Sequence, residues 1–246
     1  EHILPVLGLY SDYENKVELR PYRGTPSVFT IKTPDVFDGK QVCISMETTP
    51  EYLQDNVIVE APADENLAVA FDYAGDARWH LNVPCIFDFK RLKNGHVLMG
   101  SDRLIKLPYY VSGLYEMDMV GKVYKEFCLP GGYHHDQIEM EDGNIISLTD
   151  DFTGDTVEDH AVLVSRETGE ILKTWDYRKF LKPGCSKSGS WSDEDWFHNN
   201  AVWYDKNTNS LTFSGRHVDA MVNIDYDSGE LNWIIGDPEG WPEEYS

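Results

Sequence analysis

Short runs of β-branched and aromatic residues follow one another along the chain, and Gly, Pro, Asp and Asn separate them. Such runs are typical of β-strands bounded by turns. No segment keeps apolar residues at helical spacing over three turns. The sequence therefore predicts an all-β protein. The strand-like runs are VELRPY, SVFTIKT, QVCISM, NVIVEAP, HVLMGS, NIISLTD, AVLVSR and SLTFSG.

One turn signature recurs: an acidic or polar turn, a glycine, a polar residue, an apolar residue and then an aromatic. It contains Gly75, Gly121, Gly169 and Gly229. Glycine suits such hairpin turns because they need a positive φ. The spacing, about 50 residues, is close to the length of one four-stranded β-propeller blade. The pattern predicts a β-propeller, and a β-sandwich with similar hairpins is the alternative.

Residues 1–66 do not follow this period, and we expect them to form a small N-terminal β-sandwich-like domain. Residues 67–246 hold about four blades, whereas closed propellers often have six or more. The final stretch, GDPEGWPEEYS, resembles a loop inside a longer protein. We therefore expect the propeller to be incomplete here, with the remaining blades on a following segment or a second chain.

Charge and composition exclude several classes of protein. The chain has 43 acidic and 21 basic residues and a net charge of −22, so it should bind neither nucleic acid nor an anionic membrane surface. No apolar run reaches the length of a membrane span, about 20 residues. The four cysteines form no C-x-x-C pair, which excludes a zinc knuckle or thioredoxin motif. Free buried cysteines are expected, and disulfides stay open.

Superposing the repeats brings histidines to equivalent positions. When the turn at 94–96 is matched to the turn at 142–144, His135 falls opposite Phe87 and, with an insertion, opposite His198. Equivalent positions of propeller blades converge on the central channel, so His135 and His198 should share a site. Arg216 ends the strand that follows His198, and its rigid fork suits an anion with three oxygens. Histidine supplies a proton or a nucleophile. The set suits sulfuryl or phosphoryl transfer.

Simpler interpretations apply to the other polar clusters. His80, His96 and His160 are expected to be structural, as a single histidine at a strand start usually is. His134, His135 and Asp136 are adjacent, and neighbouring strand residues face opposite sides, so we expect no metal site without a bulge. The segment DDFTGDTVED, residues 150–159, lacks the spacing of an EF-hand and is expected to be a solvated acidic loop.

Four segments resemble one known family, the bacterial arylsulfate sulfotransferases that do not use the nucleotide sulfate donor. They are LPVLGLYSDYENKVELRPY, GGYHHDQIEMEDGNIISL, DWFHNNAVWYDKNTNSLTFSGRH and VNIDYDSGELNWIIGDP. The resemblance implies a small β domain followed by a six-bladed propeller, often as a homodimer. It implies sulfuryl transfer from a phenolic sulfate ester to a phenol acceptor through a sulfohistidine, without a metal or other cofactor.

The resemblance also implies roles for individual residues. His198 and Arg216 match the histidine and arginine that hold the sulfuryl oxygens. His135 matches a further active-site histidine, for which His134 is the weaker candidate. The candidate substrate-binding residues are His134, His217 and Asn199.

The family's nucleophilic histidine lies in a later blade, which we expect beyond Ser246. The chain is therefore expected to be an N-terminal portion of such an enzyme, with the rest of the propeller as its partner. The resemblance favours a periplasmic or otherwise exported protein, and a cytoplasmic location stays open. The alternative function is a non-catalytic propeller that binds an anionic or aromatic ligand in its central channel.

Overall fold

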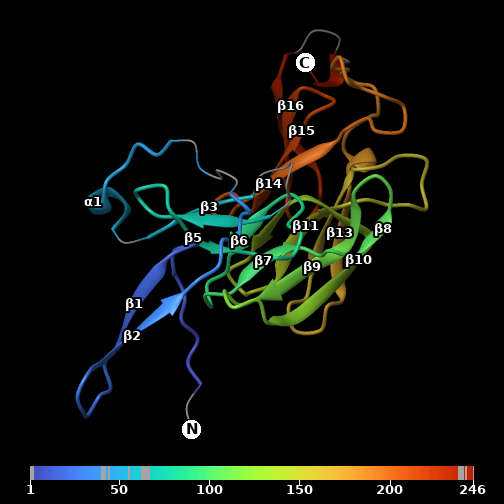
Figure 1. Cartoon of the computed structure of the whole chain (residues 1–246). Helices are drawn as coiled ribbons and strands as arrows, with labels where there is room; N and C mark the ends of the chain where they lie inside the picture. The colour runs from blue at the N-terminus through green and yellow to red at the C-terminus, as the bar shows by residue number, and fades with distance from the viewer. Residues whose placement is uncertain are drawn as a thin grey trace. The chain divides into compact units, whose positions relative to one another are not determined.

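A computed structural model describes residues 3–39, 43, 45–54, 56–61, 67–237, 241 and 243–245. The chain divides into two compact parts, Glu1–Pro84 and Cys85–Ser246 (Figure 1). Regular structure in the described residues is almost entirely β, which confirms the predicted class. The predicted domain boundary, between residues 66 and 67, falls at the edge of a segment outside the described residues, and it stays a prediction.

The first part contains two separate sheets. One is a hairpin of β1 (Glu14–Leu19) and β2 (Ser27–Lys32), and the other has the order β3 (Ile58–Glu60), β4 (Val69–Phe71) and β5 (Ala77–His80). A short helix, α1 (Pro50–Leu53), precedes β3. Positions 41, 42 and 44 of the predicted strand QVCISM lie outside the described residues. The sandwich-like arrangement predicted here stays a prediction.

The second part is built from three antiparallel four-stranded meanders. Their strands are β6 (Phe89–Arg91), β7 (Val97–Gly100), β9 (Tyr110–Met117), β10 (Val123–Glu139), β11 (Ile145–Thr149), β12 (His160–Val164), β13 (Ile171–Asp176), β14 (Asn199–Asp205), β15 (Ser210–Gly215), β16 (Ala220–Asp225) and β17 (Leu231–Gly236). A short strand, β8 (Leu104–Lys106), pairs with β9, and the 3-10 helices are η1 (Tyr177–Lys179) and η2 (Glu243–Tyr245).

Strand β10 belongs to two meanders. Its first half pairs with β9 and is the last strand of the first meander, after β6, β7 and β9. Its second half pairs with β11 and is the first strand of the second meander, before β11, β12 and β13. The register shifts between Cys128 and Tyr133, where Gly131 and Gly132 lie. A Cβ on Gly131 would lie 1.5 Å from the carbonyl oxygen of Asp150, so no side chain fits there. The third meander is β14 to β17.

The recurring glycines occupy equivalent turns. Gly75, Gly121, Gly169 and Gly229 connect β4 to β5, β9 to β10, β12 to β13 and β16 to β17. Their φ angles lie between 74° and 84°, in the left-handed region that glycine adopts without strain. The sequence repeat was therefore a repeat of hairpins, as predicted.

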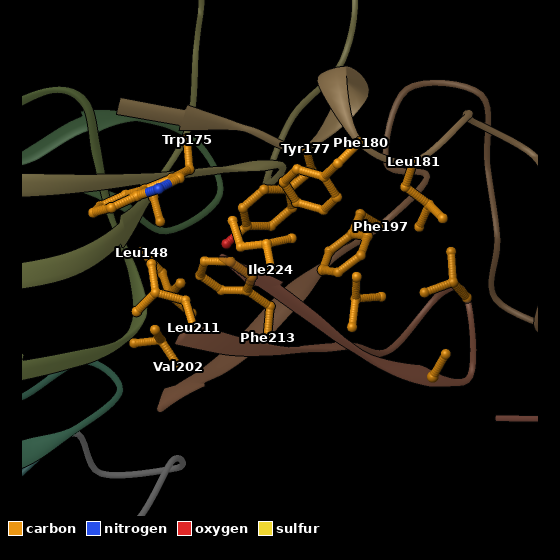
Figure 2. Close-up of a cluster of buried hydrophobic side chains, with 14 of the residues drawn as sticks. Leu148, Trp175, Tyr177, Phe180, Leu181, Phe197, Val202, Leu211, Phe213 and Ile224 are labelled. Carbon is orange, nitrogen blue, oxygen red and sulfur yellow. The ribbon is translucent and has the colours of Figure 1, made fainter. Parts of the chain in front are cut away.

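The meanders pack face to face in chain order. Both faces of β12 are buried: Leu163 packs toward the third meander and Val162 toward the first. Figure 2 shows Leu148 of the second meander and Tyr177, which follows β13, beside Phe213 of the third meander. This stacking is what a propeller requires, but the sheets of the described residues do not close, so the complete propeller stays a prediction.

Two other expectations can be compared with the structure. None of the four cysteines forms a disulfide, but only Cys85 and Cys185 are buried, and the expectation of burial is wrong for the exposed Cys128. In β10, Cys128 lies on the outward side of the strand beside the buried Phe127, which explains its exposure. Within the described part of the chain, no helix is long and apolar enough to cross a membrane.

The packing between the second and third meanders generates a matched prediction. Leu211 is fully buried in this core, so Leu211→Ala should lower the free energy of unfolding by about 2–5 kcal/mol. Leu172 is 52% exposed, and Leu172→Ala should change it by less than about 0.5 kcal/mol. Urea unfolding followed by tryptophan fluorescence measures both. Equal losses would contradict the packing.

Candidate active site

Near the start of the first strand of each meander lies a residue whose backbone is left-handed. These residues are Phe87 (φ 67°), His135 (φ 54°) and His198 (φ 53°). A positive φ is uncommon for any residue other than glycine, so three occurrences at equivalent positions are a property of the repeat. The ring centroids of Phe87 and His135 lie 4.4 Å apart, and those of His135 and His198 lie 5.8 Å apart. Residues from three meanders thus meet in one place.

Four histidines gather there. The centroid of His134 lies 4.4 Å from that of His135 and 5.1 Å from that of His198, and His198 stacks on His217 at 4.5 Å. His134, His198 and His217 are buried, and His135 is half-buried.

The expectation that His134 and His135 face opposite sides is wrong. His135 adopts a left-handed conformation, and the register between β10 and β11 shifts between Tyr133 and Gln137. Both rings therefore lie on the same side. Asp136 points elsewhere, because it pairs with Lys90 and accepts a hydrogen bond from the backbone nitrogen of Val202.

Arg216 lies beside the cluster with its side chain exposed. Its backbone nitrogen donates to the carbonyl oxygen of His198 at 3.1 Å, which fixes the two residues next to each other. Its positive charge is one of the factors that lower the pKa of His135, after burial and the neighbouring histidines. No carboxylate in the described part of the chain forms an ion pair with Arg216, so its guanidinium is available to an anion.

Glu158 is a fully buried carboxylate at the centre of the cluster. Its Oε1 atom accepts hydrogen bonds from the hydroxyls of Tyr109 (2.8 Å) and Tyr110 (2.7 Å). Its Oε2 atom forms an ion pair with Nδ1 of His198 and lies 3.3 Å from Nε2 of His134. Four side chains therefore converge on this one acid.

Asp195 is the second acid of the site. Its Oδ2 atom accepts a hydrogen bond from Nδ1 of His198 at 2.7 Å and lies 3.3 Å from Nδ1 of His217. The backbone carbonyl of Asp195 also accepts from Nδ1 of His217 at 2.6 Å. Both acids thus bind the Nδ1 side of His198 and leave its Nε2 atom for a ligand.

The expectation of a solvated acidic loop at 150–159 is wrong for three of its acids. Asp150, Glu158 and Asp159 are buried. Burial is possible because donors compensate their charges. Asp159, for example, accepts from Nε1 of Trp196 at 2.8 Å and from Nδ1 of His160 at 2.7 Å. These contacts agree with a structural role for His160, which stays a prediction.

The environment separates the protonation states of the histidines. Burial acts to lower the pKa of His198, but its hydrogen bonds to Asp195 and Glu158 outweigh that effect and raise it to about 9. Burial and the neighbouring histidines lower the pKa of His135 to about 3. Burial acts to raise the pKa of Glu158, but its interaction with His198 and the hydrogen bond from Tyr110 outweigh that effect and lower it to about 2. At neutral pH, His198 is therefore an imidazolium and His135 a neutral imidazole.

Asn199 fixes the tautomer of His134. The Nδ2 atom of Asn199 donates to the carbonyl of His160 at 2.9 Å, so its Oδ1 atom is the acceptor for Nδ1–H of His134 at 2.8 Å. The Nε2 atom of the neutral His134 ring is then unprotonated. Burial lowers the pKa of His134, which favours this neutral form.

Two sets of side chains have the spacing for a metal ion: His134, His135 and His198, and Asp195, His198 and His217. Both sets contain His198. A cation at Nε2 of His198 would have to displace a proton from a ring whose pKa is raised to about 9, and it would lie near the charge of Arg216, which acts on the neighbouring His135. The electrostatics of the site therefore favour an anion.

Half-buried aromatic rings border the histidines. The ring centroid of Tyr109 lies 5.6 Å from that of Phe87 and 5.9 Å from that of His134. Flat apolar rings of this kind suit an aryl group beside an anion-binding site. The structure thus brings together all six candidates named from the sequence, and it adds Glu158, Asp195, Tyr109 and Phe87, which sequence reasoning did not select.

The fold and this site define an all-β protein whose stacked meanders present a histidine-rich site suited to an anionic group. The family model described as Arylsulfotransferase (ASST) matches residues 43–246, and the chain belongs to this family. The predicted family resemblance is therefore confirmed.

Two relatives, both named arylsulfate sulfotransferase AssT, come from Escherichia coli O6:H1 (strain CFT073) and from Lelliottia amnigena. Each is 24% identical to this chain, and the matches cover 69% and 70% of the chain and 36% and 37% of the relatives. The chain thus spans little more than a third of the length of these relatives. A crystal structure of a protein of unknown function from Bacteroides caccae is similar with a TM-score of 0.48 and 13% identity, over 94% of this chain and 78% of that one.

Asp150 begins the loop that carries Glu158. Its Oδ1 atom accepts from the backbone nitrogens of Asp151 (2.6 Å) and Glu158 (3.2 Å). Burial raises the pKa of Asp150 to about 7, and the charges of Asp159 and Glu158 add to the effect. The folded protein therefore holds on to a proton that the unfolded chain releases at lower pH.

This raised pKa generates a prediction about stability. Between about pH 4 and pH 8 the unfolded chain binds fewer protons at Asp150 than the folded protein, so stability falls as the pH rises. Asp150→Asn removes this ionisation and keeps the acceptor oxygen. Chemical unfolding across this range should show the variant gaining stability relative to the parent as the pH rises. Parallel profiles would refute the raised pKa.

Proposed function

We propose that the complete protein transfers a sulfuryl group from a phenolic sulfate ester to a phenol acceptor. One observation carries this proposal: Arg216, without a carboxylate partner among the described residues, lies beside the positively charged His198. In a chain with a net charge of −22, two adjacent positive groups are needed to attract an anion. Membership of the arylsulfotransferase family supports the choice of sulfuryl over phosphoryl transfer.

The sulfuryl oxygens are the proposed ligands of Arg216 and His198. Sulfuryl transfer should pass through a loose transition state like that of phosphoryl transfer, with negative charge spread over the non-bridging oxygens. The fork of Arg216 binds two oxygens, and Nε2–H of His198 binds one. Each such preorganised donor contributes about 3–4 kcal/mol to the stability of the transition state.

The aryl group of the donor is expected to lie against Phe87 and Tyr109. Both rings are half-buried beside the histidines, and their spacing suits offset or edge-on contact with a third ring. This arrangement supports phenolic rather than alkyl sulfates as substrates.

Proton transfer is assigned to His135. In the empty site its pKa of about 3 keeps the ring neutral but only weakly basic, so its role as an acid and base depends on the charge of the bound substrate. A bound sulfate ester places a negative charge nearby, which raises the pKa of the ring and favours the protonated form that the departing phenolate needs.

A sulfohistidine intermediate completes the proposed reaction. The nucleophilic histidine is expected outside residues 1–246, on further blades of the propeller. The third meander supports this arrangement. Its outward face exposes Trp203 (67%) and Ile235 (57%), whereas both faces of β12 in the second meander are buried. The homodimer and the export implied by the family resemblance stay predictions.

Turnover of a chromogenic phenyl sulfate distinguishes the candidate functions. Release of the chromogenic phenol should depend on an added phenol acceptor, because transfer rather than hydrolysis is proposed. Release without an acceptor would indicate a sulfatase. Binding of the ester without any release would favour the non-catalytic propeller instead.

Arg216→Lys tests the proposed binding of the sulfuryl oxygens. The variant keeps the charge but loses the two-pronged donor, so kcat should fall by about 10²–10³-fold. Arg20→Lys is the matched control, because Arg20 is exposed and pairs only with Glu18 among the described residues. Steady-state kinetics measure both variants. Full turnover by Arg216→Lys would exclude the proposed role of Arg216 in binding the sulfuryl oxygens.

A further inference from the structure

We propose that Glu158 is a positioning residue that fixes the orientation and the charge of His198, and thereby sets the pH range of sulfuryl transfer. This inference deepens the proposed function and rests on it for its catalytic part. Neither the family match nor the sequence pattern singles out Glu158.

The backbone of Glu158 is held on both sides. It adopts a left-handed conformation with φ 57°, which is strained for a residue with a side chain. Its nitrogen donates to Oδ1 of Asp150 at 3.2 Å, and its carbonyl accepts from the nitrogen of Asn199 at 3.0 Å. The loop and the start of β14 therefore fix the acid next to His198.

The side chain of Glu158 is the less solvated of the two acids that bind His198. Its relative exposure is 1%, compared with 21% for the side chain of Asp195. A charge in a dry environment acts more strongly on its neighbour than one that water screens. Tyr109 and Tyr110 both donate to Oε1, which stabilises the carboxylate and orients Oε2 toward His198.

Three other rings face His198, those of His134, His135 and His217. Arg216 is held next to His198 through the backbone, where its nitrogen donates to the carbonyl oxygen of His198 at 3.1 Å. Glu158 and Asp195 are the acids that contact His198 in the described part of the chain. Both acids raise the pKa of His198 against burial, Asp195 first and Glu158 second, so loss of Glu158 removes one of its two acidic neighbours, the fully buried one.

The charge of His198 decides its chemistry. An imidazolium held at Nδ1 presents Nε2–H, which can donate to a sulfuryl oxygen but cannot accept a proton. Without the buried carboxylate, His198 should titrate nearer the ordinary value, about 6.5. At pH 8 it would then be neutral, and its Nε2 lone pair would repel the sulfuryl oxygens.

Glu158→Gln is the test variant, because it keeps the size and the acceptor oxygen but removes the charge. Its alkaline limb of kcat/KM should move to lower pH than in the parent protein. The kcat/KM of the variant should be about tenfold or more below that of the parent at pH 8, and the difference should be clearly smaller at pH 6. The loss should lie mainly in kcat. Asp155→Asn is the control: it removes one charge from the same loop, but Asp155 is exposed. Its profile should follow the parent.

Imidazole NMR titration of His198 supplies a readout that does not depend on turnover, and its measurement on the parent protein does not depend on the folding of the variant. In the parent, His198 should titrate with a pKa of about 9 and with Nδ1 protonated throughout. A parent value near 6.5, or an unchanged value in a folded Glu158→Gln, would overturn the inference. A raised value in a protein that turns over no sulfate ester would instead contradict the proposed function and leave the role of Glu158 in place.

Discussion

The left-handed backbone at the entrance to each inner strand is the constraint on which the site depends. Phe87, His135 and His198 share it, although an unfavourable conformation of this kind costs about 1–2 kcal/mol per residue. Packing between stacked meanders offsets that cost and holds the three rings together. The same conformation turns His135 to the side of His134. A histidine cluster therefore arises from a repeated backbone feature rather than from neighbours in the sequence.

Buried acids make this cluster suitable for an anion in a strongly acidic protein. Glu158 and Asp195 bind the same nitrogen of His198 and keep the ring charged, while Arg216 has no acidic partner among the described residues. His135, which lacks such a partner, stays neutral. The site thus separates two functions: charged groups that hold oxygens, and a neutral ring that exchanges a proton. The net charge of −22 over the whole chain makes this local arrangement necessary.

Local backbone requirements explain which features of the fold and the site could be predicted from the sequence. The all-β class, the four glycine turns and the equivalence of Phe87, His135 and His198 follow from residues that each repeat must place at the same point. Glu158 and Asp195 lie in loops that differ between repeats, and an acidic loop in a sequence looks solvated until its donors are known. The direction of His134 could not be inferred, because strand alternation fails beside a left-handed residue.

A crystal structure of the complete protein with an aryl sulfonate bound tests the central claim most directly. The sulfonate group is a stable substitute for the sulfuryl group of the substrate. Its oxygens should lie within hydrogen-bond distance of the Arg216 guanidinium and Nε2 of His198, with the aryl ring against Phe87 and Tyr109. A sulfonate bound elsewhere, or a metal ion between His134, His135 and His198, would contradict the account.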